Sequence, residues 1–277
     1  MRLGKIGIIT YSKEGFRAAV HLQRSMDNVT LFLHSDFGEI HQGAETFSKV
    51  STLMEASFRD FVCWIFIAPC GVAVRSIAPH IQSKLYDPAV LVIDAGARHV
   101  VSLLSGHEGG ANEFAVHVSN LLAADPVIST TTDAAKIWIA GIGCRKGVCK
   151  ETIMQVLDEA LQIAGITVHD IRFFATAAIK KNEQGLLDLS SDLNISLRYF
   201  PDFMIQEMES KVDVQPFVQE RVGLPGVAEP AALLGGKRTT LCVKRIAKQG
   251  VTVALAKENC WWWESAPEAE KTERTGQ

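Results

Sequence analysis

Short apolar runs alternate with helical patterns at the start of the chain, and this alternation restricts the fold more than any other feature. Residues 5–10 and 29–33 are typical of buried strands. Between them an amphipathic stripe follows Ser12, a residue type that caps helices. Residues 61–67 form an unbroken apolar run, which suits a strand in a sheet covered on both faces. The order predicts βαβ units and therefore an α/β fold.

The rest of the first half continues this pattern. We expect helices over residues 47–54, 71–81 and 111–124, and strands over 89–94 and 99–104. The short connection between the last two strands favours an antiparallel hairpin, so the sheet is expected to be mixed.

The length of 277 residues exceeds the usual size of one hydrophobic core, so two domains are expected. The polar stretch at Thr130 to Asp133 places the junction near residues 130–136. The second half repeats the α/β pattern, giving two α/β domains with mixed, mainly parallel sheets covered by helices. We expect strands over 137–140, 171–175, 195–199, 239–243 and 251–256, and helices over 151–164, 182–193 and 228–234. Residues 261–277 are expected to form a flexible tail.

Composition excludes several classes of protein. With 47% hydrophobic residues, 21% charged residues and a net charge of −3, the chain is expected to be globular and not to bind nucleic acid. The apolar run at 6–9 is too short for a secretion signal or a membrane span, so a cytoplasmic location and no membrane partner are expected. The six cysteines show no CxxC spacing and the eight histidines no HxxxH or HExxH spacing, so we predict mostly reduced, buried thiols and no metal site in the protein.

The first candidate for chemistry is the glycine-rich stretch 105–112, between a predicted strand and a predicted helix. Its glycines and the first N–H groups of the helix suit a carboxylate or phosphate, although an ordinary tight turn would give the same pattern. His107 lies at the tip, flanked by glycines, which favours proton transfer or hydrogen bonding over burial in the core.

The second candidate is 141–147, which we expect to be a turn that opens a helix. Its GxGxxxG spacing matches neither the dinucleotide fingerprint nor a P-loop. Arg145 and Lys146 make it a candidate anion-binding turn, with a solvated basic turn as the alternative. Cys144 would be a nucleophile with a lowered pKa if it lay at a helix N-terminus, but no histidine is near it in sequence.

The third candidate is Glu229, in a Gly/Pro-rich loop at the start of a short predicted helix. An acidic residue there commonly stabilises the helix dipole, and the loop setting also leaves it open as a site residue. Lys180, Lys181 and Glu183 precede a predicted helix, and Lys244 and Arg245 end a predicted strand. The cations among them are either solvated surface charges or contacts for an anionic ligand.

Several runs of the sequence together carry a resemblance to a known protein family. They are GVAVRSIAPH at 71–80, DPAV at 87–90, LLSGHEGGAN at 103–112, GIGCRKG at 141–147, Lys180 with EQGL at 183–186, and GVAEPAAL at 226–233. In this order they resemble the CbiG family, the cobalt-precorrin-5A hydrolases of anaerobic vitamin B12 synthesis. The resemblance implies an N-terminal domain at 1–135 and a C-terminal domain at 136–260, the latter similar to CobE. Longer family members carry a middle segment that this chain lacks after Asp133.

The resemblance implies that the δ-lactone on ring A of cobalt-precorrin-5A is opened to give cobalt-precorrin-5B and acetaldehyde. The cobalt belongs to the substrate, and no further cofactor is expected. His107 is expected as the general base, with Glu229 as the second choice for acid/base work. The expected substrate contacts are Arg75, Gly106, Gly109, Gly110, Asn112, Gly143, Cys144, Arg145, Lys146, Lys180, Glu183 and Lys244.

Two alternatives stay open: a non-catalytic module that binds or hands over corrinoid intermediates, and a nucleotide-dependent enzyme that uses residues 141–147. Other enzymes of the pathway are possible partners, and the oligomeric state, a homodimer included, is not determined by the sequence.

Overall fold

The computed structural model describes residues 4–37, 41–215, 219–220 and 223–259. The chain divides into two compact units, Met1–Ala134 and Ala135–Gln277, called unit 1 and unit 2 below. Each unit is described by itself. The expected tail at 261–277, with its three tryptophans, lies outside the described residues.

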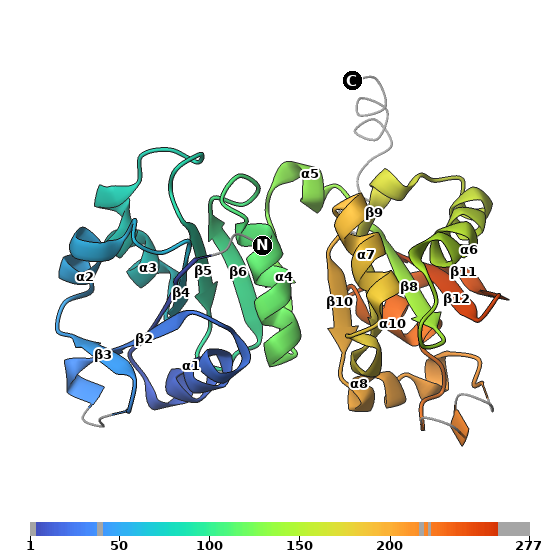
Figure 1. Cartoon of the computed structure of the whole chain (residues 1–277), viewed down its shortest axis with the longest axis horizontal. Coiled ribbons are helices and arrows are strands. Elements are labelled where there is room, and N and C mark those ends of the chain that lie inside the picture. Colours follow the sequence, from blue (N-terminus) through green and yellow to red (C-terminus); the bar gives the residue numbers. More distant parts are fainter. Residues whose placement is uncertain (1–3, 38–40, 216–218, 221–222, 260–277) are drawn as a thin grey trace, which may run out of the picture. The chain divides into compact units, whose positions relative to one another are not determined.

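Unit 1 is built on a seven-stranded sheet with the order β3-β2-β1-β4-β5-β6-β7 (Figure 1). Its strands are β1 (Ile6–Thr10), β2 (Val29–His34), β3 (Ala44–Phe47), β4 (Cys63–Ile67), β5 (Ala89–Ile93), β6 (His99–Leu104) and β7 (Asp125–Val127). The first five are parallel, whereas β6 and β7 run against them, because β5 and β6 form the predicted antiparallel pair. The strand predicted to be central, β4, lies in the middle of the sheet.

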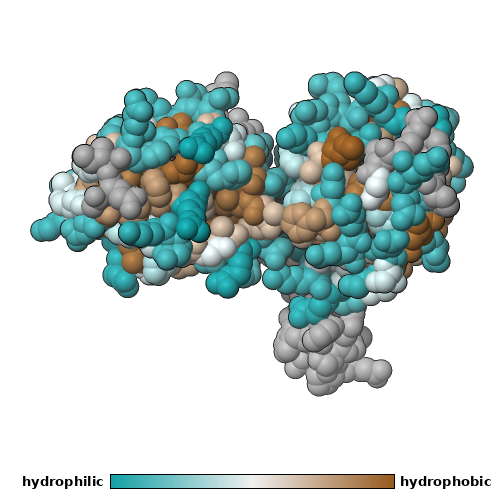
Figure 2. Space-filling view, turned by 90° about the horizontal axis from the view of Figure 1, so that it is seen from below, coloured by the Kyte–Doolittle hydropathy of each residue, from teal (hydrophilic) through white to brown (hydrophobic). Residues whose placement is uncertain are grey.

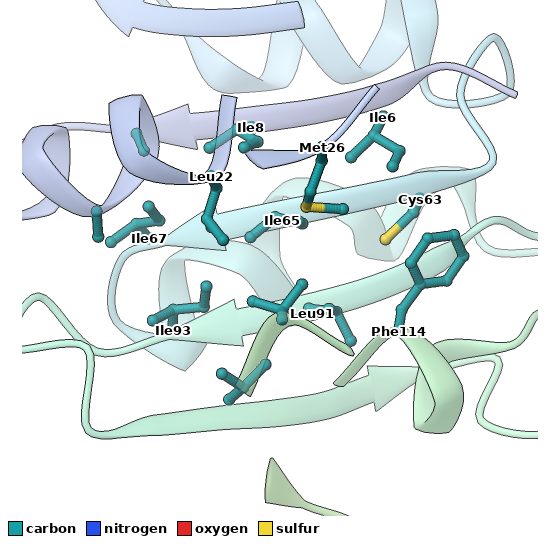
Figure 3. Close-up of a cluster of buried hydrophobic side chains, with 14 of the residues drawn as sticks. Ile6, Ile8, Leu22, Met26, Cys63, Ile65, Ile67, Leu91, Ile93 and Phe114 are labelled. Atoms are coloured by element: carbon teal, nitrogen blue, oxygen red, sulfur yellow. The ribbon is translucent and has the colours of Figure 1, made fainter. Parts of the chain in front are cut away.

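Helices cover both faces of this sheet, as expected for an α/β layer fold. The helices are α1 (Lys13–Ser25), α2 (Val50–Ser57), α3 (Cys70–Ile77), α4 (Ala111–Leu122) and the single turn α5 (Thr131–Ala134). Residues of α1 and α4 pack on one face, where Leu22 and Phe114 meet the strands around Ile65 (Figure 3). The other face is packed with aromatic side chains under α2 and α3, including Trp64 and Phe66. Ser12 caps α1, because its Oγ accepts the N–H of Gly15 at 3.0 Å.

Unit 2 is a second α/β layer with a five-stranded sheet in the order β10-β9-β8-β12-β11. Its strands are β8 (Trp138–Cys144), β9 (Ile171–Ala177), β10 (Leu197–Phe200), β11 (Thr239–Lys248) and β12 (Val251–Glu258), and its helices are α6 (Lys150–Ala164), α7 (Gln184–Leu193), α8 (Asp202–Gln206) and α10 (Ala228–Leu234). Helices α6 and α7 pack on one face of the sheet, and α8 and α10 on the other. Only β12 runs against the other four strands of this sheet.

The predicted fold class is confirmed, and the local differences have identifiable causes. Phe47 was expected to begin a helix but ends β3, because its ring packs into the aromatic core beside Tyr11. β3, β7 and α8 were not predicted, because they are short elements with little periodicity. The strand predicted at 137–140 is longer than expected, since β8 continues to Cys144.

Hydrophilic residues cover most of the face shown in Figure 2, with hydrophobic residues gathered in smaller patches. No helix among the described residues is long and apolar enough to cross a membrane. The five described cysteines are free thiols. Cys63 and Cys144 are buried as predicted, whereas Cys70, Cys149 and Cys242 are exposed, so the prediction of mostly buried cysteines was wrong.

Candidate functional site

A cavity of about 940 Å³ opens in unit 2 beside the carboxyl ends of β8 and β9. Ligands of α/β proteins commonly bind at this edge of the sheet, where loops follow the strands. The β11–β12 hairpin closes the other side of the cavity. Its lining residues are Gly143, Cys144, Arg145, Lys146, Ile179, Lys180, Val214, Gln215, Val227, Arg245, Ala247, Lys248, Gln249, Gly250, Val251 and Thr252. Five residues predicted as substrate contacts, at 143–146 and 180, therefore come together here.

Positive charge is concentrated around this cavity. Arg145, Lys146 and Arg245 line it, and none of the three has a carboxylate partner among the described residues. Lys248 also lines the cavity, but its Nζ lies 2.6 Å from Glu159 Oε2 and is partly neutralised. Because a guanidinium or ammonium group gives charge-assisted hydrogen bonds to carboxylates and phosphates, the cavity is suited to an anionic ligand.

Lys180 is held in place by Glu183. Its Nζ lies 3.4 Å from Glu183 Oε1, and both side chains are largely buried, with exposed fractions of 20% and 14%. The other carboxylate oxygen, Oε2, accepts the N–H of Gly147 at 3.1 Å. Glu183 therefore orients a cation and the 145–149 loop. It is not among the residues that line the cavity, so its predicted role as a direct contact is not supported by the geometry.

The stretch 141–147 is not the turn that the sequence analysis predicted. Gly141 and Gly143 lie within β8, and α6 begins only at Lys150. A Cβ on Gly141 would overlap the carbonyl oxygen of Ala228, so this glycine allows α10 to pack directly on the sheet. The GxGxxxG spacing therefore reflects close packing and strand geometry more than an anion-binding helix start.

Cys144 does not lie at a helix N-terminus. It ends β8 with 9% of its surface exposed, and burial raises the pKa of its thiol to about 11. Since the thiolate is the nucleophilic form, this environment disfavours the nucleophile hypothesis. Cys144 remains part of the cavity wall.

Glu229 is buried in the first turn of α10, with 3% of its surface exposed. Its Oε1 accepts the backbone N–H of Arg245 at 2.9 Å. It is not among the cavity-lining residues, and this position argues against acid/base work by Glu229 on a ligand in the cavity.

In unit 1 the glycine-rich stretch forms a closed loop before α4. The N–H groups of Ala111 and Asn112, which were expected to be free for an anion, donate to the carbonyls of Ser105 and Gly106 at 3.1 and 3.0 Å. Gly110 takes a positive φ of 83° as the N-cap, and a Cβ on Gly109 would overlap Ser105. The geometry therefore does not support an anion held by these two N–H groups, because the loop satisfies them with its own carbonyls.

Asn112 fastens this loop to the segment that leads out of unit 1. Its Oδ1 accepts from Ser102 Oγ at 2.7 Å, and its Nδ2 donates to Thr130 Oγ1 and Asp133 Oδ2, both at 2.9 Å. Thr130 Oγ1 also donates to Asp133 Oδ2 at 3.0 Å. Asn112, 9% exposed, is thus the centre of a buried hydrogen-bond network and has no N–H left for a ligand.

His107 is the accessible member of this loop. About half of its side chain is exposed (51%), and its Nε2 lies 2.8 Å from Thr132 Oγ1 and 3.5 Å from Asp133 Oδ2. An imidazole beside a carboxylate can accept a proton and be stabilised as the imidazolium. The neighbouring Glu108 is partly exposed and pairs with Lys84, and this contact holds the pKa of the Glu108 carboxyl below its usual value.

Two further predicted contacts, Arg75 and Lys244, lie outside the unit 2 cavity. Arg75 is exposed on α3 with its guanidinium over Gly71. The Nζ of Lys244 lies 3.2 Å from Asp213 Oδ2, and both side chains are exposed. Neither residue lines the unit 2 cavity, so their role as carboxylate contacts stays a prediction that this cavity does not support.

Arg245 was considered beside Lys244 but not included among the expected contacts, and Lys248 was not considered, although a sequence signal for this part of the cavity exists. Gln249 and Gly250 both have positive φ, as a two-residue hairpin turn requires. A Gln-Gly pair between two β-rich runs therefore predicts a hairpin turn at 249–250, with residues 248 and 251 paired on either side of it.

Unit 1 has a cavity of its own, of about 780 Å³, which the sequence analysis did not anticipate. It lies where β1 and β4 end and is bordered by the starts of α1 and α3, a position set by the strand order. Its wall is mainly apolar, with Asp94 and His99 at its polar side. Hydrogen bonds from the N–H groups of His99 and Arg98 outweigh desolvation and lower the pKa of Asp94.

Within the described residues, no group of three or more His, Cys, Asp or Glu side chains is arranged to hold a metal ion.

Comparison with known proteins finds a family model for a large part of each unit. Residues 52–133 match the family model "Cobalamin synthesis G N-terminal" and residues 138–256 match "Cobalamin synthesis G C-terminus". The chain is 25% identical to a cobalt-precorrin-5A hydrolase of Salmonella typhimurium, over 72% of this chain and 83% of that protein. It is 24% identical to a cobalt-precorrin-5A hydrolase of Priestia megaterium, over 91% of this chain and 95% of that protein.

That last alignment spans 357 positions, against the 277 residues of this chain, so the relative carries residues that this chain lacks. A solved structure of CobE, a protein of the cobalamin pathway, is 26% identical over 44% of this chain and 91% of CobE, with a TM-score of 0.42. The two family models together match well over half of the chain. The chain belongs to the CbiG family of cobalamin-synthesis proteins.

Proposed function

We propose that the protein is a cobalt-precorrin-5A hydrolase, which opens the ring A δ-lactone of its substrate and releases acetaldehyde. Two relatives that match most of this chain carry that name. The observation in the structure that supports the proposal best is the cationic cavity of unit 2, because it suits an apolar macrocycle with acetate and propionate groups at its edge.

The lining of this cavity divides into two kinds of surface. Arg145, Lys146 and Arg245 supply donors for carboxylates, whereas Ile179 and Val227 supply apolar contacts. A tetrapyrrole needs both, since its ring is apolar and its side chains are anionic. We assign the first three residues, together with Lys180, to binding the carboxylates of the substrate.

The reaction requires several proton transfers, and we assign them to His107. As water adds to the lactone carbonyl, a base takes its proton, and the ester C–O bond then breaks to give a carboxylate and a hydroxyl group. Removal of the hydroxyl proton lets the adjacent C–C bond break. Its electron pair passes into the macrocycle, and the two-carbon fragment leaves as acetaldehyde. Asp133, 3.5 Å from His107 Nε2, would stabilise the imidazolium formed in these steps.

The cobalt ion in this proposal arrives within the substrate, and we assign no cofactor to the protein itself. We place the reaction in the cytoplasm, and other enzymes of the pathway as its partners.

A binding or handover module is the alternative function. It is favoured by the contrast between the two units. The cavity of unit 2 offers three cations that have no carboxylate partner within the described part of the chain, whereas the loop around His107 is closed by its own hydrogen bonds. In this case the protein would bind corrinoid intermediates without changing them.

Incubation of the purified protein with cobalt-precorrin-5A separates these functions, with acetaldehyde measured through NADH consumption by alcohol dehydrogenase. Acetaldehyde formation supports the hydrolase, binding without acetaldehyde supports the module, and the absence of both contradicts the two proposals.

Replacing His107 by Ala should lower kcat by about 10²- to 10⁴-fold, the usual contribution of a proton-transfer group. The matched control is the exposed His169, whose replacement by Ala should leave kcat unchanged. A His107→Ala variant with normal kcat would remove His107 from the mechanism.

A further inference from the structure

Strand β11 is irregular where it borders the cavity. Its residues Val243 and Ile246 pair with Leu255 and Val253 of β12, so β11 advances three residues while β12 advances two. One extra residue in a strand of this kind is a β-bulge, which leaves a backbone group without its ladder partner and changes the direction of side chains.

The bulge decides where Arg245 points. Val243 and Ile246 both contact the core under α6, although they are three residues apart. In a regular strand side chains alternate, so Arg245 would share the core face with Val243. Because of the extra residue, Arg245 is exposed and lines the cavity instead.

Glu229 supplies the acceptor that the bulge requires. Its buried Oε1 accepts the N–H of Arg245 at 2.9 Å, at the position where the pairing with β12 is interrupted. Helix α10, which carries Glu229, packs against β8, β11 and β12, so the carboxylate is fixed relative to the strand. A carboxylate that accepts a backbone N–H forms a strong charge-assisted bond.

We infer that Glu229 is a positioning residue that holds the β11 bulge and thereby directs Arg245 to a carboxylate of the ligand. The inference rests on the proposed function only for the identity of the ligand, a tetrapyrrole with acetate and propionate side chains. It replaces the acid/base role that the sequence analysis gave to Glu229.

The test measures binding of uroporphyrin, a tetrapyrrole that carries acetate and propionate groups, by fluorescence, and hydrolysis of cobalt-precorrin-5A in parallel. Glu229→Leu removes the acceptor and should weaken binding about 10- to 100-fold, as expected for one lost charge-assisted contact. Glu229→Gln keeps an acceptor oxygen and should restore most of the affinity. Arg245→Met should weaken binding as much as Glu229→Leu.

The double variant Glu229→Leu/Arg245→Met decides whether the two residues act together. If Glu229 acts through Arg245, the double variant binds no more weakly than either single variant. Additive losses would overturn the inference, as would normal binding by Glu229→Leu. A loss of kcat by Glu229→Gln as large as that by Glu229→Leu, with unchanged binding, would also overturn it, since it would indicate acid/base work.

Glu229→Asp covers the case in which Glu229→Leu does not fold. Aspartate keeps the charge, but its side chain is shorter by one methylene, so its carboxylate lies farther from the N–H of Arg245. This variant should also weaken uroporphyrin binding, and wild-type affinity would contradict the inference. If no variant or wild-type protein releases acetaldehyde while uroporphyrin binding still depends on Glu229 and Arg245, the proposed hydrolase activity fails and the positioning role stands.

Discussion

Replacing Asn112 by Asp tests whether the glycine-rich loop at 105–112 is held by the hydrogen-bond network around Asn112. The substitution changes one NH₂ group into an oxygen and keeps the shape of the side chain. In the wild type that NH₂ group lies 2.9 Å from a carboxylate oxygen of Asp133. The variant therefore places two carboxylates in hydrogen-bond contact in a largely buried site. Asn112 also lies in the first turn of α4, where a negative charge is normally favourable, so the two effects have opposite signs.

The magnitudes decide between them. A carboxylate at a helix N-terminus gains about 0.3–1 kcal/mol. Two unit charges about 3 Å apart repel each other by about 6 kcal/mol at an effective dielectric constant near 20. The cost cannot exceed that of protonating one of them, about 4 kcal/mol at pH 7 for a carboxyl with an unfolded pKa near 3.9. Asp133 is 27% exposed, so solvent reduces this value. We expect a loss of about 3 kcal/mol in the free energy of unfolding of unit 1 at pH 7.

The pH dependence of the free energy of unfolding distinguishes charge repulsion from the simple loss of hydrogen bonds. Repulsion raises the pKa of the new carboxyl in the folded state above its unfolded value. Stability of the variant relative to the wild type is therefore restored below the unfolded pKa near 3.9 and lost as the pH rises through the raised value. Below the raised pKa, the difference should shrink by about 1.4 kcal/mol for each unit of pH, because the protonated group again donates to Asp133. Asn112→Ala is the control, since it loses the bonds without adding a charge and should show little dependence on pH.

Urea titration followed by hydrogen exchange of peptides from 99–122 measures the stability of unit 1 separately from unit 2. A variant as stable as the wild type at pH 7 would refute the reasoning. So would an Asn112→Asp deficit that stays constant as the pH falls.

Three other substitutions or reagents test the structure elsewhere. Gly141→Ala should destabilise unit 2 by at least about 1–3 kcal/mol in urea unfolding, since its Cβ would overlap the backbone of Ala228, and wild-type stability would contradict the packing of α10 on β8. Iodoacetamide at pH 8 should modify the exposed Cys149 and spare Cys144, whose pKa is raised to about 11, until urea unfolds the protein; mass spectrometry of the peptides shows which thiol reacts. Phe114→Ala removes a fully buried ring and should cost about 3–5 kcal/mol, so a shift below about 1 kcal/mol would show that the site collapses around the gap.

The layer architecture could be predicted because it depends on hydrophobic periodicity over many residues. The run that became β4 is apolar on both faces, and the helix that became α10 was predicted at Ala228–Leu234 as observed. Strand β7 could not be found in this way, because it consists of three residues, Asp125–Val127, and is defined by its partner β6. Short edge strands are determined by tertiary pairing, which leaves little trace in local sequence.

The candidate site was only partly predictable, because the cavity is assembled from distant segments. Arg145 and Lys146 were identified from the glycine-rich stretch that follows a predicted strand, and Lys180 from its place before a predicted helix and from the family resemblance; all three line the cavity. Lys244 was chosen as an expected contact over Arg245, its neighbour in sequence. The bulge in β11 determines which of the two side chains reaches the cavity. A bulge changes the direction of a side chain but leaves no trace in composition or periodicity.

The two glycine-rich stretches show why a motif is a weak guide to chemistry until its hydrogen bonds are known. Both were predicted to bind anions at a helix N-terminus. In one, the N–H groups of Ala111 and Asn112 already donate to loop carbonyls, and in the other Gly141 and Gly143 belong to a strand. In the described part of unit 2, the donors that reach the cavity are instead the long cationic side chains of Arg145, Lys146 and Arg245. Anion binding should therefore weaken with rising ionic strength, as contacts between charged side chains do, more than it would if buried backbone N–H groups held the ligand.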